Sequence, residues 1–130
     1  MEIEMNTLTS RIIGTGILFI FVFLSGVWLS NSGKPINVVI LTIHKLIGLA
    51  TLIFIGVTIY QLNQEVKLNA LELGASVITG LLFLVTIITG GLLSTGNPVV
   101  AAILTIHRIG PFLTVLSTVV TMYLLVNHPQ

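Results

Sequence analysis

The sequence contains no cysteine. This absence excludes a disulfide scaffold, thiolate zinc and iron–sulfur sites, and covalent attachment of haem through a C-x-x-C-H motif. Charge is also scarce, because only five Lys and Arg and four Asp and Glu occur among 130 residues. The resulting net charge of +1 provides no basic surface for nucleic acid, so we expect no nucleic-acid partner.

The chain is rich in apolar residues. Hydrophobic residues make up 55% of the chain and charged residues 7%, whereas a soluble domain has about a quarter of its residues charged. Four apolar stretches, at residues 12–30, 36–62, 71–93 and 99–126, each exceed or approach the ~20 residues that cross a bilayer as a helix. We predict an all-α, four-transmembrane-helix bundle, which forms a single domain over residues 1–130 of a multi-pass integral membrane protein.

The sequence also contains an internal repeat. A 13-residue segment that contains His44 aligns without gaps, at an offset of 63 residues, with a segment that contains His107. The first and third apolar stretches match at an offset of 64 residues, for example at Gly26 and Gly90. The chain is therefore predicted to be two tandem helical hairpins, at about residues 10–62 and 71–126. Repeats of two spans share one topology, which predicts a pseudo-twofold axis along the membrane normal.

His44 and His107 are the most informative residues of this repeat. Each lies nine residues after a proline, Pro35 or Pro98, so the two imidazoles are expected at the same depth in the bilayer. An ionisable side chain at this depth is costly unless it is paired or liganded. Two imidazoles that face each other across a helix bundle can ligate the metal of a planar macrocycle. We therefore predict that His44 and His107 are the axial ligands of one b-type haem.

Other residues are predicted to lie around such a flat ligand. Lys45 and Arg108 directly follow the two histidines, and cations within a membrane need an anionic partner, which the two haem propionates would supply. Pro111 removes a backbone hydrogen bond to the carbonyl of His107 and is expected to bend the fourth helix. The remaining predicted cofactor-binding residues are Gly26, Gly48, Thr51, Gly90, Gly110 and Thr114.

The pattern of histidines in the second and fourth spans, each in an I-H-[KR] context, resembles small membrane cytochromes of the b type, including the haem-bearing anchor subunits of respiratory enzymes. The resemblance implies bis-histidine ligation of a non-covalent haem by His44 and His107. It also implies a role as an electron carrier or subunit rather than a stand-alone enzyme, with a quinone or a redox protein as partner and a plasma or inner membrane as location. The larger dihaem members carry two histidines on each of two helices, so this chain is limited to one haem.

Alternative interpretations stay open. The histidines could hydrogen-bond a neighbouring helix, the glycines could be close-packing positions, and Thr51 and Thr114 could satisfy backbone carbonyls. A small transporter could bind an anionic substrate through Lys45 and Arg108, and a cofactor-free scaffold or assembly protein needs no ligand. Homo-oligomerisation is left open. His128, near the chain end, is expected to have no role.

Overall fold

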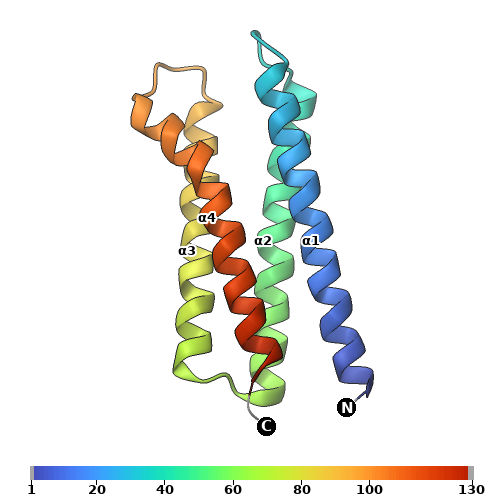
Figure 1. Cartoon of the computed structure of the whole chain (residues 1–130). Coiled ribbons are helices and arrows are strands. Elements are labelled where there is room, and N and C mark those ends of the chain that lie inside the picture. Colours follow the sequence, from blue (N-terminus) through green and yellow to red (C-terminus); the bar gives the residue numbers. More distant parts are fainter. Residues whose placement is uncertain (1, 129–130) are drawn as a thin grey trace. The chain divides into compact units, whose positions relative to one another are not determined.

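The computed structural model describes residues 2–128, which contain helices and no strand. The four helices are α1 (Glu2–Asn31), α2 (Val38–Val66), α3 (Ala70–Leu93) and α4 (Ala101–Val126) (Figure 1). Each contains a segment that is long and apolar enough to cross a membrane. The predicted all-α fold with four membrane-spanning helices is thus confirmed.

The chain divides into two compact units, Met1–Thr58 and Ile59–Gln130, with a boundary inside α2. In the first unit α1 lies beside α2, and in the second α3 lies beside α4 (Figure 1). Each unit is therefore built around one helical hairpin, as the repeat predicts. The axis that relates the two hairpins stays a prediction.

Local sequence explains where the helices begin and end. α1 starts ten residues before the predicted apolar stretch, because residues 2–10 contain Glu, Met and Leu, which favour helix, and no Gly or Pro. Hydropathy alone identifies only the part of the helix that is apolar. α2 begins after Asn37, whose side-chain oxygen accepts hydrogen bonds from the backbone N–H groups of Val39 and Ile40 at 3.0 and 3.2 Å.

Only residues 67–69 connect α2 to α3. Lys67 adopts a positive φ of 49°, and its N–H donates to the Asn63 carbonyl, which ends α2 in a left-handed turn. Asn69 then caps α3: its side chain accepts from the Glu72 N–H, while the Glu72 carboxylate accepts from the Asn69 N–H. This reciprocal capping box allows one helix to follow the other without a long loop.

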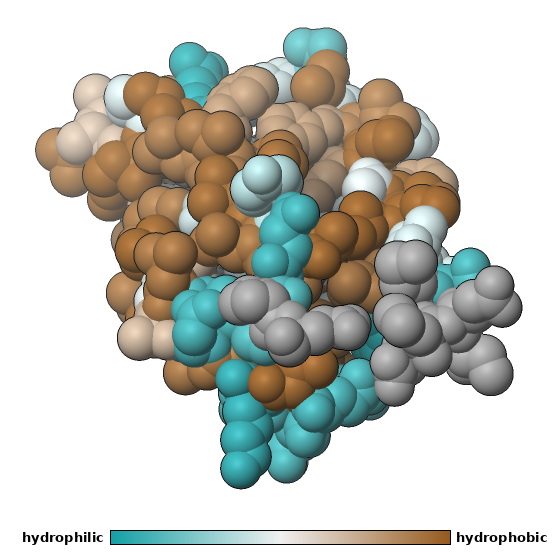
Figure 2. Space-filling model, turned by 60° about the horizontal axis from the view of Figure 1, so that its bottom comes forward, coloured by the Kyte–Doolittle hydropathy of each residue, from teal (hydrophilic) through white to brown (hydrophobic). Residues whose placement is uncertain are grey.

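The surface is apolar and much of the interior is polar. Figure 2 shows hydrophobic residues (brown) over most of the visible surface, with hydrophilic residues (teal) in smaller groups. Large side chains such as Leu24, Val38 and Phe112 are more than 60% exposed. Among residues 6–128, six hydrophobic residues are buried, against ten polar or charged ones, of which eight are threonines. Because lipid is as apolar as leucine, membrane helices pack through small and hydroxyl-bearing residues instead.

α4 contains the predicted helix-internal proline, Pro111, and remains helical through it. Figure 1 shows the first turns of α4 (orange) inclined to the rest of the helix (red). A proline lacks the N–H that would bond the carbonyl four residues earlier, here that of His107, and its ring bends the helix at that point.

Four spans require that both hairpin loops lie on one side of the membrane and the α2–α3 connection on the other. Since the chain has no cysteine, single variants Ser32→Cys, Thr95→Cys and Lys67→Cys can be labelled with a membrane-impermeant maleimide in sealed vesicles. We expect Ser32→Cys and Thr95→Cys to react from the same side and Lys67→Cys from the opposite side. Labelling of all three from one side would contradict the four-span topology.

Candidate functional site

His44 lies on α2 and contacts α1 of the same hairpin. Its Nδ1 atom is 2.9 Å from Oγ of Ser25, a residue that is 8% exposed. The Ser25 hydroxyl also donates to the Val22 carbonyl at 3.0 Å. The ring is partly buried and is held by α1 through this nitrogen.

His107 has the corresponding contact in the second hairpin. Its Nδ1 atom lies 3.2 Å from Oγ1 of Thr89 and 3.0 Å from the Thr86 carbonyl, both on α3. The Thr89 hydroxyl donates to its own helix, at 2.8 Å from the Val85 carbonyl. Each histidine therefore uses Nδ1 to bind a hydroxyl on the preceding helix.

The two contacts are equivalent in the repeat as well as in chemistry. Ser25 and Thr89 match at the offset of 64 residues that relates the first and third spans. His44 and His107 are each the seventh residue of their helix, about 9 Å along its axis from the first residue. The duplicated sequence has thus produced the same polar contact twice, once inside each hairpin.

Gly26 and Gly90 admit the histidine rings. A Cβ atom on Gly26 would lie 3.2 Å from Cε1 of His44, and one on Gly90 would lie 2.6 Å from Cε1 of His107. Both glycines were predicted to leave room for the haem; in the structure the ring beside each of them is the imidazole of the same hairpin. Any larger residue at position 90 must displace the histidine.

The other predicted site residues differ in what surrounds them. Gly110 is buried, and a Cβ there would lie 2.7 Å from Oγ1 of Thr86, so this glycine serves close packing of α3 on α4. A Cβ on Gly48 would meet no atom within 4 Å. Lys45 and Arg108 are exposed, one residue and about 100° around the helix from the histidines.

Thr51 and Thr114 are almost completely buried, at 0% and 2% exposure. Their hydroxyls donate to the carbonyls of Ile47 and Gly110 in their own helices, at 2.7 and 2.8 Å. This pairing with backbone carbonyls is the simpler of the two roles considered for them. It explains how a hydroxyl can be buried there without cost.

The structure shows a polar stripe along one face of α2 and of α4, which we did not predict from the sequence. On α2 and α4, a histidine is followed at steps of seven residues by two threonines. Seven residues are close to two helical turns, so these side chains share one face. Every threonine of the stripes is at most 2% exposed. The stripes consist of His44, Thr51 and Thr58 on α2 and of His107, Thr114 and Thr121 on α4.

The partners of the last threonines differ between the hairpins. Thr121 bonds Thr79 of α3, with 3.0 Å between the hydroxyl oxygens. Thr58 instead accepts a hydrogen bond from Nη1 of Arg11 on α1 at 3.2 Å. The side chain of Arg11 therefore reaches the interior of its hairpin and contributes a cation that has no counterpart in the second hairpin.

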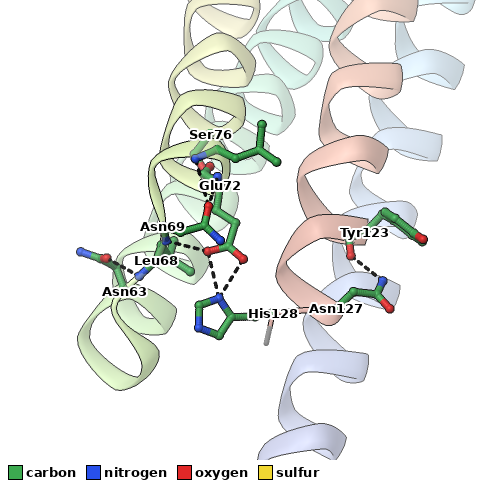
Figure 3. Close-up of polar contacts among 9 residues, drawn as sticks. Asn63, Leu68, Asn69, Glu72, Ser76, Tyr123, Asn127 and His128 are labelled. Atoms are coloured by element: carbon green, nitrogen blue, oxygen red, sulfur yellow. Dashed lines mark hydrogen bonds and ion pairs between the residues drawn. The ribbon is translucent and has the colours of Figure 1, made fainter. Parts of the chain in front are cut away.

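His128, which we expected to have no role, pairs with Glu72 at the start of α3 (Figure 3). The Glu72 residue is only 2% exposed, and its two carboxylate oxygens lie 2.8 and 2.9 Å from Nδ1 of His128. A buried carboxylate needs such partners, because an unpaired charge would be costly. The pair connects the segment that follows α4 to Glu72, which also belongs to the capping box at the start of α3. A lone glutamate and a distant histidine gave no sequence signal for this contact.

Among the side chains that the structure describes, those of residues 6–128, no group of three or more His, Cys, Asp and Glu is arranged to hold a bare metal ion. Comparison of the chain with protein-family models, with curated proteins and with solved structures gave no match. A function must therefore be inferred from the geometry of the two histidine contacts.

Substitution of Gly90 by alanine is expected to destabilise the α3/α4 hairpin by about 1–3 kcal/mol, because the new methyl group overlaps His107. The matched control is Gly80→Ala on the same helix, where a Cβ meets nothing within 4 Å. There the better helix propensity of alanine should leave stability unchanged or raised by up to about 1 kcal/mol. Thermal unfolding in detergent, followed by circular dichroism, compares the two. Equal midpoints would contradict the described contact.

Replacing Glu72 by glutamine keeps the size and the capping geometry but removes the charge that faces His128. We expect a loss of about 1.5–3 kcal/mol, the range for a hydrogen bond that involves a charged group. Glu65→Gln is the control, because Glu65 is an exposed carboxylate near the end of α2. The same unfolding measurement applies, and a Glu72→Gln midpoint equal to that of Glu65→Gln would show that the pair contributes nothing.

Proposed function

We propose that this protein is a membrane-bound electron carrier of the b-cytochrome type, in which His44 and His107 are the axial ligands of one non-covalent haem. The observation that carries the proposal is the duplicated contact of these histidines with Ser25 and Thr89. Metal-ligating histidines characteristically bond one ring nitrogen to a neighbouring group, which orients the ring while the other nitrogen binds the metal.

The donor set fits a haem iron better than a bare ion. A haem iron takes only its axial ligands from the protein, and two histidines suffice. A tetrahedral zinc ion would need further histidine, cysteine or carboxylate ligands. Nδ1 of each ring is bound to the preceding helix, so we assign the iron to Nε2 in both rings. Bound haem would supply one-electron redox chemistry.

The residues beside the histidines have defined roles in this proposal. Lys45 and Arg108 would bind the two propionates, because each is a cation one residue from a ligand and exposed on its helix. The open face at Gly48 would admit the edge of the macrocycle. Gly110 packs against Thr86, so it would not contact the haem and would contribute only by allowing α3 and α4 to pack closely.

Function as a carrier also requires an electron donor and acceptor. A quinone or a redox protein would fill these roles, in a plasma or inner membrane, and the chain would act as an anchor or relay subunit. A cofactor-free scaffold is the second candidate, because the bonds from His44 and His107 to hydroxyls would also join helices without any metal.

The proposal is tested by adding haem to the detergent-purified protein and recording its visible spectrum. We expect a Soret band and, after reduction, the sharp bands of low-spin iron with one haem per chain. His44→Ala and His107→Ala should each lose the low-spin spectrum, because one axial ligand is removed.

His128→Ala is the matched control. This histidine is paired with Glu72, so its removal should leave the spectrum unchanged. A wild-type protein that stays colourless supports the scaffold instead, and a low-spin spectrum in either ligand variant overturns the assignment of that histidine.

A further inference from the structure

We propose that Ser25 is a positioning residue that holds His44 in the Nδ1–H tautomer, and that the Thr86 carbonyl, together with the Thr89 hydroxyl, holds His107 in the same form, so that the lone pair of each ring is on Nε2. The tautomer follows from the hydrogen bonds alone. Its consequence for the iron, described below, rests on the proposed haem.

For His107 the backbone determines the tautomer. The Thr86 carbonyl lies 3.0 Å from Nδ1, and a carbonyl oxygen can only accept a hydrogen bond. Nδ1 must therefore carry the proton. The Thr89 hydroxyl, 3.2 Å away, accepts from the same N–H, because its own hydrogen is directed to the Val85 carbonyl.

For His44 the tautomer follows from competition for a single hydrogen. The Ser25 hydroxyl has one hydrogen, and we assign this hydrogen to the Val22 carbonyl at 3.0 Å, because a carbonyl oxygen can only accept. Its oxygen then accepts from the imidazole, which places the proton of His44 on Nδ1. In each hairpin a hydroxyl that is committed to its own helix thus acts as the acceptor for the ring.

Gly26 and Gly90 complete this arrangement. Each follows the hydroxyl-bearing residue directly, and the ring atom that contacts it, Cε1, lies between the two nitrogens. The Ser25 hydroxyl in the first hairpin and the Thr86 carbonyl in the second determine which nitrogen is protonated, and in both hairpins the glycine allows the ring close enough for the bond. The dipeptides Ser25-Gly26 and Thr89-Gly90 therefore work as units, which explains why both members recur in the repeat.

The same bond would tune an iron bound to Nε2. An acceptor on Nδ1–H draws the proton away from the ring, which makes the imidazole a stronger donor to the metal and favours the oxidised iron. Loss of the Ser25 hydroxyl should therefore raise the reduction potential of the haem while His44 remains a ligand.

The first experiment needs no haem. In apoprotein labelled with ¹⁵N-histidine, the chemical shifts of Nδ1 and Nε2 report the tautomer of each neutral ring, with signals assigned through His44→Ala and His107→Ala. We expect Nδ1–H at both positions in the wild type. Ser25→Ala should populate the Nε2–H form of His44, while Ser25→Thr should retain Nδ1–H. Thr89→Val should leave His107 as Nδ1–H, because the Thr86 carbonyl remains. An Nε2–H signal for either wild-type ring, or no change in Ser25→Ala, overturns the proposal.

The second experiment separates failure of this inference from failure of the proposed function. The reduction potential of haem-loaded protein is measured for the wild type, Ser25→Ala and Ser25→Thr. A positive shift in Ser25→Ala, largely restored in Ser25→Thr, with low-spin spectra throughout, is the expected result. A haem-binding wild type whose potential is unaffected by Ser25→Ala overturns the tuning role alone. A wild type that binds no haem overturns the proposed function, and the tautomers are still decided by the shifts.

Discussion

The structure depends on one constraint: lipid offers no hydrogen-bond partners, so each polar group inside the spans must find its partner within the protein. Threonine meets this requirement repeatedly by donating to the carbonyl four residues earlier, as Thr51, Thr58 and Thr114 do. Within the described residues, every buried side-chain nitrogen or oxygen has a partner. A polar interior can therefore coexist with an apolar surface.

The same constraint explains why the two histidines contact hydroxyl groups. An imidazole within the membrane must direct at least one nitrogen to an acceptor or donor, and in each hairpin the preceding helix provides one at the matching position. Ser25 and Thr89 are themselves bonded to backbone carbonyls, which holds their oxygen atoms in place beside the rings. A ligand that is oriented before the metal arrives loses less conformational freedom on binding, which suits the proposed haem site.

The two hairpins share this contact but have diverged elsewhere. The first contains an arginine, Arg11, bonded to Thr58, where the second has a bond between Thr79 and Thr121. The second alone has Pro111 and the Glu72–His128 pair. The duplicated chain has thus kept the histidine contacts while other positions of the two hairpins changed.

The sequence by itself determined that the chain lies in a lipid bilayer, that it forms four helices and that it contains a repeat. Hydropathy, length and the recurrence of His, Gly and Thr are properties of the chain alone. The sequence also singled out the histidines, since an ionisable residue in an apolar span is costly wherever it points. Only the tertiary structure decided which atoms they bind: the contacts of Nδ1 with Ser25 and Thr89 depend on the rotation of one helix against another. The Glu72–His128 pair likewise joins residues 56 positions apart. No local pattern encodes such a contact, because it forms only when the hairpin closes.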